Sequence, residues 1–197
     1  CRWCQGYHRQ KTGWLIIGND IIDLEIALDK PRLKNDRFLS KVFTDSEISQ
    51  IYSQSHPELA IWKMWSMKET AYKAHQRLFQ IPARLDPVTY ECDLYNLCVI
   101  KEQKNYSINL EQDENHIYSW LEFKNLDHIK IPYSTNYKSD FIKEFAIRTD
   151  LDLRNIELRK NHIGIPELFL KHLGANLPIS ITHHGRFAAI CFPLINC

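Results

Sequence analysis

The sequence lacks three features that would assign the chain to a broad class at once. No apolar run approaches the ~20 residues that a bilayer-spanning helix needs, and residues 1–13 have no apolar stretch of the signal-peptide kind. The formal net charge of +1 lacks the basic excess that proteins coating nucleic acid usually carry. We therefore expect a cytoplasmic protein with no membrane partner and no nucleic-acid partner.

The cysteines lack the spacing of a complete metal site. Cys1 and Cys4 resemble half of a zinc site, but no second pair with ligand spacing follows among the 6 cysteines. Reduced thiols in a cytosolic protein are the simpler interpretation. With 197 residues, of which 44% are hydrophobic, the chain is long enough to bury a core. We place one domain at residues 14–194 and treat residues 1–13 as an N-terminal extension.

Apolar periodicity predicts the elements of the first half. Residues 14–17 form an apolar run typical of a buried strand, which breaks at Gly18-Asn19-Asp20. Residues 31–42 indicate a short helix or loop with a basic exposed side. A capping box at 44–47 begins a helix at about 45–53. The clearest helix runs from Glu58 to about Phe79, without glycine or proline.

The second half is richer in β-branched and aromatic residues. Alternation of polar and apolar residues predicts an antiparallel meander over 88–131. Residues 138–149 have the pattern of a helix, and 177–194 that of a hairpin around His183-His184-Gly185. Together these patterns predict an α+β fold in which a small antiparallel sheet packs on the long helix.

Three charged residues are candidates for chemistry. Asp20 follows the predicted strand, although an isolated aspartate there is more often a turn or cap residue. Glu69 and Lys73 lie four residues apart, on one face of the long helix with Trp62 and Ser66. An exposed Glu–Lys pair would be of little consequence. In a tryptophan-rich setting, however, a carboxylate beside an ammonium suits a metal ion plus a phosphate.

Five segments resemble one family. Two of them are Gly18-Asn19-Asp20 and the segment WSMKETAYK at 65–73, and 44 residues lie between them. Their residues and this gap resemble the bipartite signature of the 4′-phosphopantetheinyl transferase superfamily. The segment VFTDSE at 42–47 resembles an intervening step. Residues 155–166 and 180–189 are similar to the Gly-x-Pro turn and the histidine strand of holo-acyl-carrier-protein synthases. The motif order is closest to these short enzymes, whereas WSMKE is closer to the tandem type.

The resemblance implies both a reaction and a set of residues. The implied reaction is magnesium-dependent transfer of 4′-phosphopantetheine from coenzyme A to a serine of an apo carrier protein, such as an acyl carrier protein, releasing 3′,5′-ADP. Asp20 and Glu69 would hold Mg²⁺ and, with Lys73, form the catalytic set, while Glu69 or a water on the metal would be the base. The implied coenzyme A-binding residues are Lys68, Lys73, Gly164, Pro166, Ser180, Thr182 and His183, with the adjacent His184 as an alternative to His183 at the 3′-phosphate.

The resemblance also has gaps. It covers about 14–82 and 150–194, so the β-rich stretch at about 83–149 looks like an insertion. Ile22 stands where tandem enzymes carry a third acidic ligand, which favours a two-carboxylate site. Met64 stands where many short enzymes carry arginine. The short enzymes are trimers with sites at subunit interfaces, which implies a homo-oligomer.

A basic run precedes the capping box. Since carrier proteins are acidic, the run is a candidate docking surface, although a solvated face would look the same. The residues are Arg32, Lys34, Arg37 and Lys41. Two other functions are consistent with the sequence: a non-catalytic carrier-binding relative, and a metal-dependent phosphodiester hydrolase.

Overall fold

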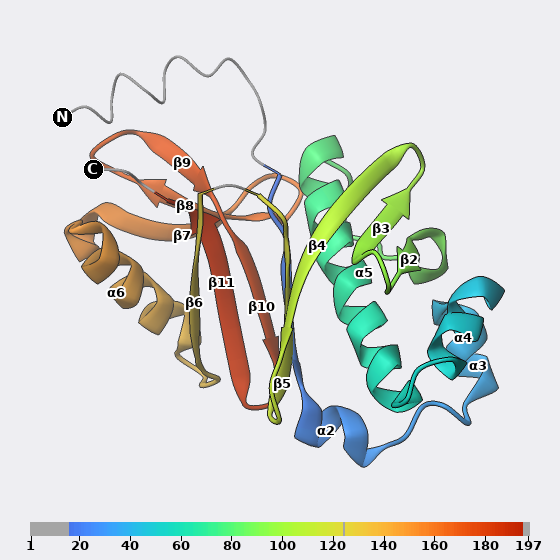
Figure 1. The fold of residues 1–197 in the computed structure, drawn as a ribbon. Helices are drawn as coiled ribbons and strands as arrows, with labels where there is room; N and C mark the ends of the chain where they lie inside the picture. Colours follow the sequence, from blue (N-terminus) through green and yellow to red (C-terminus); the bar gives the residue numbers. More distant parts are fainter. Residues whose placement is uncertain (1–15, 124, 195–197) are drawn as a thin grey trace.

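The structure is a computed structural model that describes residues 16–123 and 125–194. Two lobes lie side by side, and strands β1 and β10 run between them (Figure 1). Helices and antiparallel sheets are combined in both lobes, so the predicted α+β class is confirmed. The first lobe contains β1 (Asn19–Asp23), α2 (Leu24–Asp29), α3 (Asp36–Val42), α4 (Asp45–Tyr52), α5 (Pro57–Phe79), η1 (Pro87–Thr89), β2 (Glu91–Asp93), β3 (Cys98–Lys101), β4 (Lys104–Gln112) and β5 (His116–Leu121).

The second lobe is built from residues 125–194. Its elements are β6 (Leu126–Pro132), α6 (Tyr137–Thr149), η2 (Leu153–Asn155), β7 (Ile156–Lys160), β8 (Pro166–Leu170), β9 (Ala175–Pro178), β10 (Ser180–His184) and β11 (Phe187–Pro193). Across the described residues the strands form a five-stranded sheet in the order β1-β5-β4-β3-β2 and two three-stranded sheets, β10-β11-β6 and β7-β8-β9.

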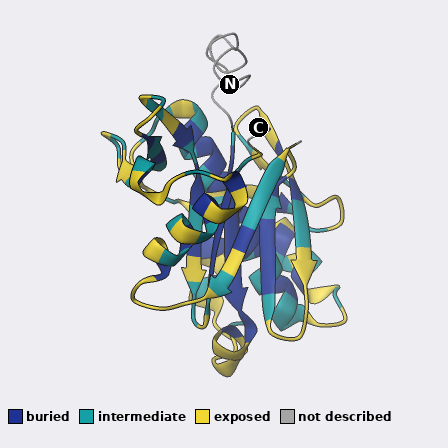
Figure 2. Cartoon of the chain, turned by 90° about the vertical axis from the view of Figure 1, so that its left-hand side faces the viewer, coloured by how far each residue is buried: buried dark blue, intermediate teal, exposed yellow. Residues whose placement is uncertain are grey.

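Each lobe has its own hydrophobic core. In the first lobe, α5 packs on the five-stranded sheet through Ile61, Met64 and Met67, which are fully buried. In the second lobe, α6 packs on β6 and β7 through Phe141 and Phe145. Buried residues accordingly gather along the central strands, whereas the outer faces of the helices are exposed (Figure 2). Within 16–123 and 125–194, no helix combines the length and the apolar content that crossing a membrane requires.

The predicted helices are confirmed. The capping box closes the N-terminus of α4, because Thr44 Oγ1 accepts from the backbone N–H of Glu47 and the Glu47 carboxylate accepts from Thr44. Helix α5 begins with Pro57, whose missing N–H costs nothing in the first turn, and ends at Gln80 in the left-handed conformation with φ 50°. The predicted helix at 138–149 is α6, and the predicted hairpin at 177–194 is β10 and β11.

The first strand lies later than predicted. The predicted residues 14 and 15 fall outside the described part, and the strand covers 19–23, where a break was expected. The polar residues of β1 are all buried and bonded to distant partners; Tyr118, for example, accepts a hydrogen bond from Asn19 Nδ2. The preceding Gly18 lies against α5, where a Cβ would collide with the backbone carbonyl of Thr70. Only glycine therefore lets β1 approach the helix this closely.

The stretch at 83–149, expected to be an insertion, is part of both sheet systems. Its strand β5 pairs with β1 along the whole of 19–23, and β6 pairs with β11. The predicted meander over 88–131 is confirmed for β2 to β5, but β6 leaves it for the second lobe. This stretch therefore supplies central strands and a helix of the core rather than a separate unit.

The two lobes are joined by an unusual ladder between β1 and β10. Backbone N–H groups of β1 donate to side chains of β10: Asn19 to Ser180 Oγ at 3.2 Å, Ile21 to Thr182 Oγ1 at 3.4 Å and Asp23 to His184 Nδ1 at 3.0 Å. The partners advance by two residues along both strands in the same direction, so the strands run parallel. Because side chains replace backbone carbonyls as acceptors, β1 and β10 are not neighbours in one backbone-paired sheet.

Candidate active site

A cleft opens where β1, α5 and β10 meet. Its lining comes from both lobes: Asp20, Ile21, Ile22, Trp65, Glu69, Lys73, Ile181, Thr182, His183 and His184. The three predicted catalytic residues therefore lie in one cleft, although they are 49 and 4 residues apart in the sequence. Helix periodicity explains part of this, because Trp65, Glu69 and Lys73 repeat every four residues and share one face of α5.

The Asp20 carboxylate is held from both lobes. Its Oδ1 accepts a hydrogen bond from Thr182 Oγ1 at 2.8 Å and from Lys73 Nζ at 3.0 Å. Lys73 Nζ also donates to Asn19 O at 2.9 Å. An ammonium has three donors, so these two bonds leave Lys73 one N–H for a ligand. Asp20 is thus fixed in orientation before any ligand binds.

The Glu69 carboxyl group shares the cleft with this pair. Burial raises the pKa of Glu69 to about 7, the nearby Asp20 carboxylate adds to the rise, and the Lys73 ammonium opposes it. A carboxylate with a raised pKa is a stronger base than an ordinary glutamate. Glu69 can therefore hold or accept a proton near neutral pH, or give up its proton to a cation.

The carboxylates of the cleft fit a magnesium ion. Asp20 Oδ2 is buried, and within the described ranges it has no hydrogen-bond partner. An orphaned carboxylate oxygen of this kind needs a cation or a donor. No group of three His, Cys, Asp or Glu side chains in 16–123 and 125–194 is arranged to hold a metal. Mg²⁺, however, is commonly bound by one or two carboxylates, with water and substrate phosphates completing its shell.

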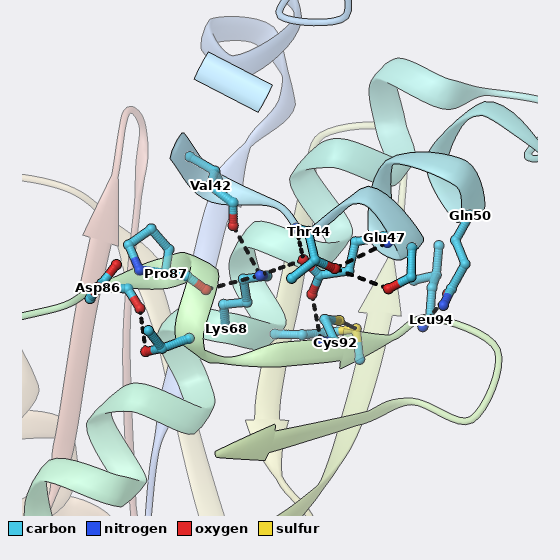
Figure 3. Close-up of polar contacts among 12 residues, drawn as sticks. Val42, Thr44, Glu47, Gln50, Lys68, Asp86, Pro87, Cys92 and Leu94 are labelled. Atoms are coloured by element: carbon cyan, nitrogen blue, oxygen red, sulfur yellow. Dashed lines mark hydrogen bonds and ion pairs between the residues drawn. The ribbon is translucent and has the colours of Figure 1, made fainter. Parts of the chain in front are cut away.

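Lys68 is not part of the cleft, which corrects the prediction that it assists phosphate binding. Its side chain is fully buried and donates to Glu47 Oε2 at 2.8 Å, Val42 O at 2.9 Å and Pro87 O at 2.9 Å (Figure 3). All three ammonium donors are thereby used. Burial lowers the pKa of Lys68, and the Glu47 carboxylate opposes that shift. Lys68 ties the segment between α3 and α4 to α5 and cannot reach a phosphate in the cleft.

Two of the predicted coenzyme A-binding residues instead hold β1 in place. The Ser180 hydroxyl is buried, accepts from Asn19 N and does not line the cleft. Thr182 does line the cleft, but its hydroxyl is taken up by Asp20 and by the backbone of Ile21. Their hydroxyls therefore position the Asp20 strand, and their binding of coenzyme A stays a prediction.

Gly164 and Pro166 lie beyond the cleft, at the C-terminal end of α5. Gly164 has φ 86° in the turn between β7 and β8, a conformation that favours glycine. Pro166 O accepts from the buried Arg77 guanidinium at 3.1 Å, one helical turn past Lys73. The turn is thus anchored to the catalytic helix but does not line the cleft.

The structure separates the two adjacent histidines. His183 points toward the second lobe, where its ring stacks on Tyr133 with 4.9 Å between centroids and lies 5.3 Å from the Tyr137 ring. Burial lowers the pKa of His183, and the positive charges of Lys73 and Lys138 add to the decrease. His184 points the other way and accepts from the backbone of Asp23. Two cations therefore act on His183, which makes its surroundings attractive to a phosphate.

Sequence reasoning missed the residues around His183. Tyr133, Tyr137 and Lys138 come from the end of β6 and the start of α6, within the stretch assigned to an insertion. The Lys138 ammonium lies 5.7 Å from the Tyr137 ring centroid. The only sequence signal was the aromatic and basic composition of 133–138, which does not reveal that these side chains meet His183.

The predicted docking residues lie at the other end of α5. Lys34, Arg37 and Lys41 are exposed, whereas Arg32 is half-buried with its guanidinium 5.3 Å from the Phe38 ring centroid. The segment is attached to the first turn of α5, because the Arg32 and Leu33 backbone N–H groups donate to the Glu58 carboxylate. Three of the four basic side chains are therefore free on the surface near the N-terminal end of the catalytic helix.

Comparison with known families agrees with this geometry. A family model of the 4′-phosphopantetheinyl transferase superfamily matches residues 16–120, just over half of the chain. The chain therefore belongs to the 4′-phosphopantetheinyl transferase superfamily. The match contains Asp20, Glu69 and Lys73, and it extends through β5, well into the stretch assigned to an insertion. A search of curated proteins finds no match.

Proposed function

We propose that this protein is a holo-acyl-carrier-protein synthase-type enzyme that transfers 4′-phosphopantetheine from coenzyme A to a serine of an apo acyl carrier protein. The observation that carries the proposal is the meeting of Asp20, Glu69 and Lys73 in one cleft between the lobes. The superfamily supports phosphopantetheinyl transfer in general. A non-catalytic binding scaffold would need none of these three side chains at this position.

Each residue has a physical role in the proposed reaction. Lys73 offers its remaining N–H to a phosphate of coenzyme A, and its charge attracts the diphosphate. Asp20 and Glu69 would hold magnesium, which supplies positive charge against the negative charge that builds on the departing 3′,5′-ADP. The Glu69 carboxylate lines the same cleft and can take the proton of the attacking serine hydroxyl. The serine oxygen then bonds to the pantetheine-side phosphorus as the bond to the leaving phosphate breaks.

The position of the basic segment suggests how a carrier reaches the cleft. Glu58 attaches residues 32–33 to the first turn of α5, and Trp65 on the same helix lines the cleft two turns later. An acidic carrier bound to Lys34, Arg37 and Lys41 would therefore lie beside the Trp65 end of the cleft. The phosphates would lie at the Lys73 end. A cytoplasmic location, where coenzyme A and carriers occur together, is part of the proposal.

Both lobes of one chain contribute to the cleft, with β1 and α5 on one side and β10 on the other. The homotrimer implied by the short enzymes stays a prediction. Light scattering tests it: an active monomer would remove that expectation, and a stable trimer would support it.

Intact-mass spectrometry tests the proposed function. An apo acyl carrier protein is incubated with this protein, coenzyme A and magnesium, and a gain of one phosphopantetheine arm is expected, with no gain in EDTA. A folded protein that modifies none of several carriers would contradict the proposal and favour the non-catalytic relative. Hydrolysis of coenzyme A without a carrier would instead support a phosphodiester hydrolase, which the same two carboxylates and lysine could serve.

A further inference from the structure

The His184 imidazole stands between the backbone of β1 and the cleft. Its Nδ1 accepts a 3.0 Å hydrogen bond from the backbone N–H of Asp23, and its ring lines the cleft that holds Asp20 and Glu69. Because Nδ1 is the acceptor, the neutral ring carries its proton on Nε2. The backbone of β1 therefore fixes the tautomer and presents an Nε2–H donor on the far side of the ring.

The Nε2–H donor of His184 has no partner among the described residues, whereas most of the polar groups around it already form hydrogen bonds. Lys73 spends two of its three donors on Asn19 O and Asp20 Oδ1, and the Thr182 hydroxyl donates to Asp20. The carboxylates of Asp20 and Glu69 are acceptors when ionised. Within the described ranges, no residue accepts a hydrogen bond from His184 Nε2. A ligand group that only accepts hydrogen bonds would satisfy this donor, and phosphoryl oxygens are such groups.

We infer that His184 is a coenzyme A-binding residue whose Nε2–H donates to an oxygen of the diphosphate in the cleft. The inference rests on the proposed function, since it takes coenzyme A as the ligand. Both histidines line the cleft, but the inference assigns different tasks to them: His183 packs on Tyr133 near Lys138, and His184 accepts from Asp23 N–H and offers Nε2–H to the ligand. The same ring also forms a rung of the ladder that joins the lobes, so its two nitrogens have separate roles.

Two substitutions separate the two nitrogens. In His184→Asn, the amide oxygen replaces Nδ1 as the acceptor for Asp23 N–H, but no donor reaches the Nε2 position. In His184→Gln, the amide nitrogen lies near the Nε2 position, but the acceptor for Asp23 is lost. The coenzyme A affinity of each variant is measured by titration calorimetry in magnesium-containing buffer, and the thermal midpoint Tm is measured without ligand.

The two variants are expected to change different quantities: His184→Asn the affinity for coenzyme A, and His184→Gln the stability. His184→Asn keeps a Tm close to that of the wild type, and its Kd for coenzyme A weakens about tenfold, as expected for one lost hydrogen bond. His184→Gln lowers the Tm by about 4 °C or more, and its Kd stays within about threefold of the wild-type value. Wild-type affinity in His184→Asn overturns the inference. Equal loss of affinity in both variants also overturns it, because the effect would then come from the rung with Asp23.

The same titration keeps this inference apart from the proposed function. A wild-type protein that binds coenzyme A but modifies no carrier contradicts the transferase proposal, while the comparison of the two variants still decides the role of His184. A wild-type protein that does not bind coenzyme A overturns both.

Discussion

The Thr182 hydroxyl donates a 2.8 Å hydrogen bond to Asp20 Oδ1 and thereby connects the two lobes at the centre of the cleft. Thr182 lies on β10 in the second lobe, and Asp20 lies on β1 in the first. The same hydroxyl accepts from the backbone of Ile21, so one side chain fixes both the strand and its carboxylate. The orientation of Asp20 therefore depends on contacts between the lobes and not on the first lobe alone.

Replacing Thr182 by valine tests this connection. Thr182→Val keeps the shape but removes the hydroxyl, so the Asp20 carboxylate and the Ile21 N–H each lose a partner. We expect a loss of about 1–3 kcal/mol in the free energy of unfolding and a fall of about tenfold in kcat/KM. Thr182→Ser keeps the hydroxyl and is expected to retain most of the activity. Equal activities in the two variants would refute a positioning role for the hydroxyl.

Replacing Glu69 by glutamine tests the proposed metal site. Glu69→Gln keeps the size of the side chain but removes its charge and its basicity. We expect carrier modification to fall at least about a hundredfold while the protein stays folded. Mass spectrometry of the carrier and circular dichroism of the enzyme are the measurements. Glu122→Gln, an exposed carboxylate outside the cleft, is the matched control. Near-normal turnover in Glu69→Gln would remove Glu69 from the site.

Sequence reasoning succeeded where local rules decide the structure. The capping box and the absence of glycine and proline predicted α4 and α5, because helix formation depends on neighbours within a few residues. The four-residue spacing of Glu69 and Lys73 predicted that both lie on one face of α5. The prediction that Asp20 lies near that face came from the resemblance to a family and not from a local rule. The three residues do line the same cleft.

Sequence reasoning failed where distant partners decide. The first strand was expected at residues 14–17 with a break at 18–20, but the buried Asn19 belongs to β1 and bonds to Tyr118, which is 99 positions away. Asp23, likewise buried, bonds to Arg186, which is 163 positions away. No local pattern reveals such partners. The family resemblance implied that Lys68 binds coenzyme A together with Lys73, yet adjacent helical residues differ by about 100° around the axis, so Lys68 and Glu69 face different surroundings.

Replacing Lys68 tests whether its role is structural. Lys68→Met leaves the Glu47 carboxylate buried without its counter-charge, so we expect a loss of about 3–5 kcal/mol in the free energy of unfolding. Adding Glu47→Gln removes that charge and should restore part of the loss. Urea denaturation measures both variants. Weakened coenzyme A binding in a Lys68→Met protein of unchanged stability would contradict the structural role and revive phosphate binding.

The pH dependence of stability tests a second link between the lobes. Tyr118 OH accepts from Asn19 Nδ2 and lies 2.9 Å from His128 Nδ1, to which its O–H can donate only while that nitrogen carries no proton. Burial lowers the pKa of His128 below its usual 6.5. The folded protein therefore binds fewer protons than the unfolded chain in this window, and stability present above pH 6.5 is lost as the pH falls.

A non-titrating replacement isolates this effect. His128→Asn keeps an acceptor near Nδ1 but cannot be protonated. Thermal unfolding is followed at about pH 7.5 and about pH 5, values on either side of the ordinary histidine pKa. We expect the Tm of the wild type to fall more between these values than that of His128→Asn. Part of the fall should remain, because burial also lowers the pKa of His75. Identical pH profiles would show that His128 does not contribute.

Charge reversal tests the proposed carrier-docking surface. Arg37 and Lys41 lie exposed on α3, away from the cleft, so they can attract an acidic carrier without contacting coenzyme A. For Arg37→Glu combined with Lys41→Glu, we expect KM for the carrier to rise about tenfold at low salt, with KM for coenzyme A unchanged. The difference from the wild type should shrink near 1 M salt, where charges are screened within about 3 Å. A variant with Lys143→Glu and Lys160→Glu, two exposed lysines in the second lobe, controls for the same change in net charge. If that variant has the same effect as the α3 changes, overall charge rather than this surface attracts the carrier.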